Sequence, residues 1–232
     1  YRLLDGTRPE IIITTLASLQ CFWASSESFL EHTWTIACDD ELPRDEIAEK
    51  LILNGYQRVD LCEDVGTFAV RGSIIDVYTP EHDSPIRLDL FGDTIASLKF
   101  FNPATQRTFQ KMERVNFYPI REIILSEENK ESAIQELQAL GDSLTIPTRK
   151  IHSTIEEVRV GNYFFGIEAL WPAFFPLKEK VFDQIVEPET IIISLYEDGA
   201  EEQISEHWSH SMEAREAALE QNRLVFPVDT YL

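Results

Sequence analysis

The sequence predicts an α/β protein whose body is interrupted by an inserted α+β domain with an antiparallel sheet, at about residues 33–120. Strand-like segments joined by short polar turns follow one another from residue 67 to 118, which is typical of an antiparallel meander. β-Branched runs and helical patterns outside this region indicate a mixed body around it. With 232 residues, of which 44% are apolar, the chain can form one large domain or two small ones.

The first segments predict a strand, a short helix and a second strand. Residues 11–15 are rich in β-branched side chains and follow Pro9, so we expect a buried strand that leads into a short helix. Residues 32–37 (HTWTIA) predict the second strand.

A helix is predicted at residues 43–54. Pro43 suits its first turn, acidic residues follow at its positive end, and Gly55 ends it. Its apolar side is predicted to consist of Ile47, Ala48, Leu51 and Ile52.

The strand-rich region contains four predicted segments. The segment at 67–79 carries Arg71 and Gly72, and we expect Gly72 to mark a bulge or a close approach of another backbone. The further segments lie at 85–93, 94–101 and 107–118.

The C-terminal part predicts two helices and a strand. Ser126 is placed to cap a helix that Gly141 ends, with an apolar stripe of Ala133, Ile134, Leu137 and Leu140. We expect the aromatic segment at 161–176 to be packing material, in which Pro172 and Pro176 limit any helix. A buried strand is predicted at 189–197, and a solvated acidic helix at 197–220.

The formal charge of -21 argues against a free-standing binder of nucleic acid or membranes, because attraction to phosphate needs a basic face. No apolar run is long enough for a membrane span, and no signal peptide is expected. Three cysteines without a CxxC pair favour a reduced, cytoplasmic location. The sequence starts without Met, so we expect a fragment of a longer protein.

We expect no catalytic residue, metal site or cofactor in this chain. The glycines form neither GxxxxGK[ST] nor GxGxxG, and the nucleophile motifs GxSxG and SxxK do not occur. The histidines show no HExxH spacing, and His207 and His210 are expected on a solvated helix face.

The most informative pattern is the alternation at residues 86–91. Residues two apart share a face of a strand, so Ile86, Leu88 and Leu90 are predicted to face the core. Arg87, Asp89 and Phe91 then face away from it, and arginines and aromatic residues are enriched at binding hot spots. Arg71 is expected on a neighbouring strand with Ala69 and Ser73, where it can join this patch. The alternative is that both arginines pair with Asp76, Asp89 or Asp93 on a solvated sheet.

Several segments carry a family resemblance. The segments NGYQRVD, GTFAVRGSIIDVYTP, PIRLDLFGDTIASLKFFNPATQRT and FYP resemble the UvrB-homology module of UvrB and the transcription-repair coupling factors (Mfd). The downstream segment VGNYFFGIEALWPAFFP and the upstream segment RPEIIITTLASLQ are more similar to the coupling factors than to UvrB.

The resemblance implies a UvrB-like body, with residues 1–32 as the remainder of domain 1A and 121–232 as domain 1B, both remnants of a helicase-type domain. Residues 33–120 would be the inserted domain that binds UvrA. By motif, the UvrA-docking surface maps onto Arg71, Arg87 and Phe91, with Ser73, Asp89 and Asp93 as weaker additions. We expect Arg87→Ala and Phe91→Ala each to cost about 2 kcal/mol of partner binding and to leave the fold intact.

For the parent protein, the resemblance implies an ATP-dependent translocase on double-stranded DNA, which uses ATP and Mg²⁺ and recognises stalled RNA polymerase in regions absent here. It also implies that the parent's C-terminal domain masks the docking surface. Two alternatives remain open: a fragment of the UvrB excinuclease subunit, or a scaffold that does not bind UvrA.

Overall fold

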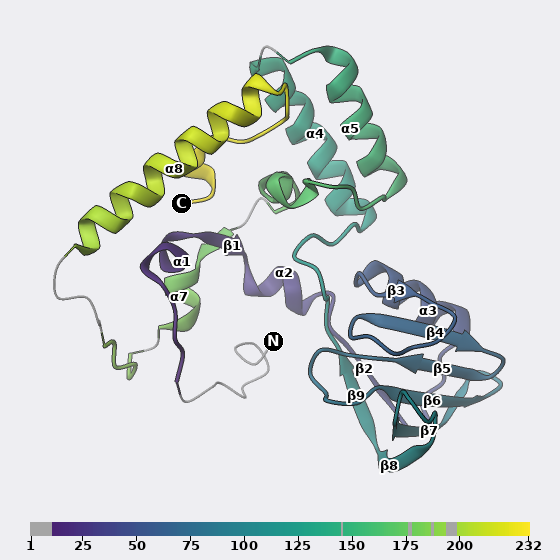
Figure 1. Ribbon diagram of the computed structural model, residues 1–232. Coiled ribbons are helices and arrows are strands. Elements are labelled where there is room, and N and C mark those ends of the chain that lie inside the picture. Colours follow the sequence, from purple (N-terminus) through teal and green to yellow (C-terminus); the bar gives the residue numbers. More distant parts are fainter. Residues whose placement is uncertain (1–10, 145, 176–177, 187, 194–198) are drawn as a thin grey trace. The chain divides into compact units, whose positions relative to one another are not determined.

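The computed structural model describes residues 11–144, 146–175, 178–186, 188–193 and 199–232. The chain divides into two compact units: one is formed by residues up to Ser28 together with Leu125–Leu232, and the other is Phe29–Ile124 (Figure 1). The fold is a mixture of helices and antiparallel sheets, as the sequence predicts. The assignment of the flanks to domains 1A and 1B stays a prediction.

The unit Phe29–Ile124 is built around a six-stranded sheet with the order β3-β4-β5-β6-β7-β8. Strands β4 to β8 form the predicted antiparallel meander, and β3 pairs parallel to β4. The strands are β3 (Gln57–Arg58), β4 (Thr67–Arg71), β5 (Ile74–Val77), β6 (Ile86–Phe91), β7 (Thr94–Phe101) and β8 (Thr108–Met112).

One face of this sheet carries the main core of the unit. Helix α3 (Arg44–Leu53) and the strand pair β2 (Trp34–Ala37) and β9 (Arg114–Phe117) pack against it. Trp34 and Phe117 stack across the β2–β9 pair with ring centroids 4.5 Å apart. The buried core residues include Ile47, Leu51, Phe68, Ile75, Val77, Ile86, Leu88, Leu90, Ile95 and Leu98.

Two predictions for this unit are wrong in detail. Ile52 is 52% exposed, because α3 buries only Ile47, Ala48 and Leu51. The segment at 67–79 is a hairpin rather than a single strand with a bulge: Gly72 has φ +61 and forms a two-residue turn with Ser73. Ser73 therefore lies in a turn and does not share a strand face with Arg71.

The other unit is mainly helical. Its longest helices are α4 (Glu127–Ser143), α5 (Thr148–Val160) and α8 (Ala200–Glu220). The shorter elements are α1 (Leu16–Gln20), β1 (Phe22–Ala24), α2 (Ser26–Leu30, which continues into the sheet unit), η1 (Ile167–Leu170), α6 (Trp171–Phe174), β10 (Lys178–Lys180), α7 (Val181–Ile185) and η2 (Val228–Thr230). Strands β1 and β10 pair antiparallel.

The predicted strand at 11–15 is wrong, because these residues form no strand and most are exposed; the short helix after them is confirmed as α1. The predicted strand at 189–197 is also wrong for residues 189–193, and residues 194–197 lie outside the described part. The acidic helix is confirmed as α8, which buries none of its residues; residues 197 and 198 lie outside the described part.

The helix after Ser126 begins as predicted, since the Ser126 hydroxyl accepts a hydrogen bond from the Asn129 amide at 3.2 Å. It does not end at Gly141 but continues to Ser143. Gly141 instead lies where α5 approaches, and a Cβ there would come within 2.7 Å of the Ile151 side chain. No helix was predicted from the sequence at the position of α5. The aromatic segment is packing material as predicted from residue 167 to 175, where Ile167, Leu170, Ala173, Phe174 and Phe175 are buried. The prediction is wrong for Phe165, which is 95% exposed, and Pro176 lies outside the described part.

Candidate functional site

The candidate site lies on the face of the six-stranded sheet that α3 does not cover. The alternation in β6 is confirmed: Ile86, Leu88 and Leu90 are buried on the core face, while Arg87 and Asp89 are half-buried on the other. Phe91 is 84% exposed at the end of β6. The pairing of β6 with β7 shifts its register between Asp89 and Leu90, just before Phe91 in the sequence.

Asp76, at the centre of β5, is the acceptor that joins the two arginines. Its side chain is fully buried, and both of its oxygens accept hydrogen bonds from guanidinium groups. Arg87 donates from Nε to Oδ1 at 2.7 Å and from Nη2 to Oδ2 at 2.9 Å, which is a two-pronged ion pair. Arg71 donates from Nη2 to Oδ2 at 2.5 Å. Strand β5 runs between β4 and β6, so Asp76 faces Arg87 directly across the ladder.

Gln106 completes this cluster from the loop between β7 and β8. Its side-chain oxygen accepts from Nη2 of Arg71 at 3.1 Å and from Nη2 of Arg87 at 3.0 Å. Its backbone oxygen accepts from Nη1 of Arg87 at 3.2 Å. We call Arg71, Asp76, Arg87 and Gln106 the arginine cluster.

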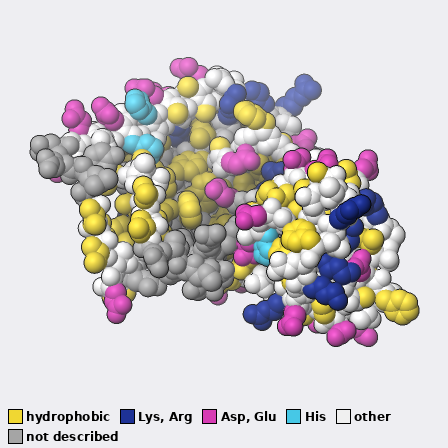
Figure 2. Space-filling view, turned by 60° about the horizontal axis from the view of Figure 1, so that its bottom comes forward, with side chains coloured by type: hydrophobic (Ala, Val, Ile, Leu, Met, Phe, Trp, Pro, Cys, Tyr) yellow, Lys and Arg dark blue, Asp and Glu magenta, His cyan; other side chains and the backbone are white. Residues whose placement is uncertain are grey.

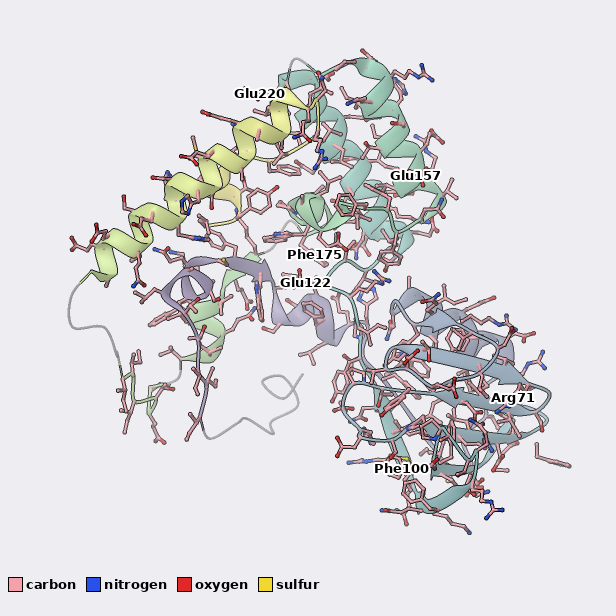
Figure 3. All side chains as sticks on the ribbon, in the orientation of Figure 1. Arg71, Phe100, Glu122, Glu157, Phe175 and Glu220 are labelled. Carbon is pink, nitrogen blue, oxygen red and sulfur yellow. The ribbon has the colours of Figure 1, made fainter. Side chains whose placement is uncertain are left out.

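The two arginines differ in their environments. The Arg87 side chain is 14% exposed, and its guanidinium carbon lies 4.6 Å from the centroid of the buried Phe101 ring. The hydrogen bond with Asp76 raises the pKa of Arg87. The Arg71 side chain is 42% exposed at the end of β4, next to the turn (Figure 3).

The pairing of both arginines with Asp76 is the alternative that the sequence left open, and it changes the expected role of Arg87. Nε and Nη2 of Arg87 already donate to Asp76 of the same chain, so they are not available to a partner. The prediction that Arg87→Ala leaves the fold intact conflicts with this geometry, since the change would remove the two-pronged partner of a fully buried carboxylate. One carboxylate does not neutralise two guanidinium groups, so the cluster keeps one net positive charge.

The weaker predicted residues occupy the margin of the site. Asp89 accepts from Lys99 Nζ and Ser97 Oγ, both at 2.7 Å. Burial alone would raise the pKa of Asp89, but these two hydrogen bonds outweigh it and lower the pKa. Ser73 and Asp93 are exposed in turns, where their carbonyls accept from the amides of Leu90 and Leu42, both at 2.8 Å.

The two hairpin turns lie at the same end of the sheet. The Leu90 amide bonds to Ser73 in the β4–β5 turn, and Phe91 follows Leu90 directly. This brings the exposed ring to the end of the sheet where Arg71 lies. Arg44 of α3 also reaches this end, donating to the carbonyl of Gly72 at 3.0 Å.

Lysine and arginine side chains lie close together over the part of the sheet unit that is turned to the viewer in Figure 2. The uncovered face of the sheet carries Arg71, Arg87, Lys99 and Lys111 against Asp76 and Asp89. It is therefore slightly cationic on a chain of charge -21.

Five side chains of the site were not predicted from the sequence, namely Arg44, Ser97, Lys99, Phe101 and Gln106. Gln106 reaches Arg71 from 35 positions along the chain, and no periodic pattern marks such a contact. The available signal was its place in NPATQRT, one of the segments that carry the resemblance. Among the described residues, no group of three or more His, Cys, Asp or Glu side chains is arranged to hold a metal ion, and no helix could cross a membrane.

Comparison with known proteins supports the resemblance. Residues 35–122 match the family described as the UvrB interaction domain. A transcription-repair-coupling factor of Myxococcus xanthus is 41% identical over 140 residues, which are 60% of this chain and 12% of that protein. The transcription-repair-coupling factor of Mycobacterium tuberculosis is 27% identical over 167 residues, 71% of this chain and 14% of that protein. UvrABC system protein B of Kosmotoga olearia is 28% identical over 134 residues, 57% of this chain and 20% of that protein. The matches thus cover well under two thirds of the length of these relatives.

Proposed function

We propose, on the premise that residues 35–122 form a UvrB interaction domain, that this chain recruits UvrA as the N-terminal region of a transcription-repair coupling factor. The observation that carries the proposal is the exposed Phe91 ring at the same end of the sheet as Arg71, on the uncovered face of that domain. Exposed aromatic rings and arginines supply most of the energy at many protein interfaces.

The proposed mechanism is recognition rather than chemistry. A ring that is already exposed needs no rearrangement to enter a partner's apolar pocket, and hydrogen bonds hold the neighbouring guanidinium groups before binding. In an acidic chain, a local cationic spot also favours one orientation of the partner. In this proposal the parent masks the surface until repair is needed.

The activities of the longer protein belong to the same proposal. Regions outside this chain would recognise stalled RNA polymerase, bind double-stranded DNA and use ATP with Mg²⁺. This chain would bring UvrA to that site for nucleotide excision repair.

The test is a calorimetric titration of the 232-residue chain with purified UvrA. Wild type is expected to bind, and Phe91→Ala is expected to weaken binding by about 2 kcal/mol, or about 30-fold in Kd. Phe109→Ala is the matched control, because Phe109 is also an exposed ring, 61% exposed on β8. Equal affinity of wild type and Phe91→Ala would show that Phe91 is not part of the UvrA-binding surface. If wild type does not bind UvrA, the alternative of a scaffold that does not bind UvrA is favoured.

A second candidate, a fragment of UvrB, is favoured by the match to UvrABC system protein B. A gel shift with damaged DNA and UvrA separates the two, since stable loading of this chain onto the lesion is expected only of UvrB.

A further inference from the structure

The arginine cluster distributes its hydrogen bonds unequally between the two arginines. Arg87 donates from Nε, Nη1 and Nη2 to Asp76 and Gln106. Arg71 donates only from Nη2, and among the described residues its Nε and Nη1 have no acceptor. The uncompensated positive charge of the cluster is therefore accessible at Arg71, which is also the more exposed of the two side chains.

Gln106 holds this arrangement from a backbone conformation that glutamine rarely adopts. Its φ is +59, in the left-handed region, which is strained for a residue with a side chain such as that of glutamine. The loop is closed around it by hydrogen bonds from the Gln106 amide to Asn102 at 2.7 Å and from the Asn102 amide to Arg107 at 2.9 Å.

The side chain of Gln106 is oriented as well as positioned. Its Nε2 donates to the carbonyl of Pro103 at 2.7 Å, which turns Oε1 toward the Nη2 atoms of both arginines. Glycine or asparagine would fit the backbone more easily, but glycine has no side chain and asparagine is one methylene too short to make the same contacts. A glutamate of the same length would bring a second negative charge and remove the net charge of the cluster.

We propose that Gln106 is a positioning residue for recognition. It holds Arg71 so that the Nε and Nη1 edge of the guanidinium group faces outward. This edge receives a carboxylate of the partner, next to the partner's pocket that receives the Phe91 ring. Arg87 and Asp76 anchor the cluster inside the sheet, and Arg71 makes the contact. This inference rests on the proposed function, because the partner is taken to be UvrA.

The first test compares Gln106→Glu with Gln110→Glu in titrations with UvrA. Both variants replace a glutamine of the same region by a glutamate, but only Gln106 touches the arginines, and Gln110 is exposed on β8. Gln106→Glu is expected to raise Kd at least tenfold, and Gln110→Glu less than threefold. Equal losses from the two variants would show a general charge effect and overturn the inference.

The second test asks whether Gln106 acts through Arg71. Gln106→Gly is expected to keep the fold, because glycine adopts positive φ freely, and to raise Kd at least fivefold. In an Arg71→Ala background, the same change is expected to have little further effect on Kd. A full effect in that background would show that Gln106 acts by another route. Gln106→Asn provides the same comparison if the glycine variant does not fold.

The third test needs no partner and separates this inference from the proposed function. In wild type, the NMR signals of the Arg71 and Arg87 side-chain N–H groups are expected to show restricted rotation. In Gln106→Gly, the Arg71 signals are expected to show faster rotation than in wild type, because Arg71 keeps only its single hydrogen bond to Asp76, whereas the Arg87 signals stay restricted by two hydrogen bonds to Asp76. Mobile Arg71 signals in wild type would overturn the positioning role even if UvrA binds. If the Arg71 signals are restricted but UvrA does not bind, the proposed partner and the carboxylate contact are contradicted. The positioning of Arg71 by Gln106 would still hold.

Discussion

The two faces of the six-stranded sheet are built on different physical principles. On the covered face, Phe68, Ile75 and Leu88 are fully buried against α3 and the β2–β9 pair. On the uncovered face, Asp76 is equally inaccessible, but its partners are two guanidinium groups, which in turn donate to the amide oxygen of Gln106. The covered face is stabilised by excluding apolar surface from water. The uncovered face is stabilised by ion pairs and hydrogen bonds beside a smaller apolar cluster of Cys62, Ala69 and Phe101.

Adjacent residues of one strand serve the two faces. Leu88 faces the core, and Arg87 and Asp89 face the cluster side. Core packing tolerates changes of shape if volume is kept, whereas a polar cluster depends on individual atoms. A change at Leu88 is therefore expected to alter stability alone, whereas a change at the neighbouring Arg87 is expected to alter both stability and recognition.

The largest expected effect is on the covered face. Leu88→Ala is expected to lower the free energy of unfolding by about 4 kcal/mol, because it removes a fully buried side chain and leaves a cavity. Urea denaturation monitored by circular dichroism measures this loss. UvrA affinity of the molecules that remain folded is expected to stay unchanged.

Leu61→Ala is the matched control for Leu88→Ala, since Leu61 is 40% exposed in the same unit, and a loss below about 1 kcal/mol is expected there. A loss of UvrA affinity in folded Leu88→Ala would show that recognition on the uncovered face depends on the packing of the covered face.

A smaller effect on stability is expected on the uncovered face. Asp76→Asn keeps the shape of the side chain but leaves Arg71 and Arg87 without their counter-charge, so the free energy of unfolding should fall by about 2 to 3 kcal/mol. Unlike Leu88→Ala, this variant is also expected to weaken UvrA binding, because Arg71 loses its anchor. Denaturation and titration on the same sample measure both quantities.

Asp64→Asn provides the control for Asp76→Asn, because Asp64 is an exposed acid in the loop before β4. Unchanged UvrA affinity in Asp76→Asn would show that recognition does not depend on the cluster.

The sequence predicted the covered face better than the uncovered one. Alternation in a strand depends only on neighbouring residues, so the orientations of Ile86, Arg87, Leu88 and Phe91 were correct. The Asp76 contacts with both arginines link three strands, and the Gln106 contacts link residues 19 and 35 positions apart. Such contacts depend on strand pairing and loop shape, which periodicity does not encode.

The errors in secondary structure have local causes. The β-branched run at 11–15 favours a strand by propensity alone, but propensity is weak where no partner strand is paired with it. The hairpin at Gly72 was missed because residues 67–79 are apolar on both sides of the turn. The end of α4 was misplaced because Gly141 serves close packing with Ile151 rather than termination.

The smallest expected effect concerns pH at the margin of the covered face. His82 lies in the turn between β5 and β6, with its ring centroid 5.2 Å from that of Phe100. Burial lowers the pKa of His82 below its usual 6.5, although Asp83 opposes this shift. The unfolded chain therefore binds a proton more readily than the folded one in the range just below pH 6.5.

The contribution of His82 to stability is complete above pH 6.5 and is lost as pH falls through that value toward the lower pKa of the folded state. Between pH 7.5 and 5.5, wild type is expected to lose slightly more stability than His82→Gln in urea denaturation. His152→Gln is the matched control, because His152 is exposed on α5, and it should follow wild type. If His82→Gln shows the same pH dependence as wild type, this margin of the covered face does not respond to protonation in this range.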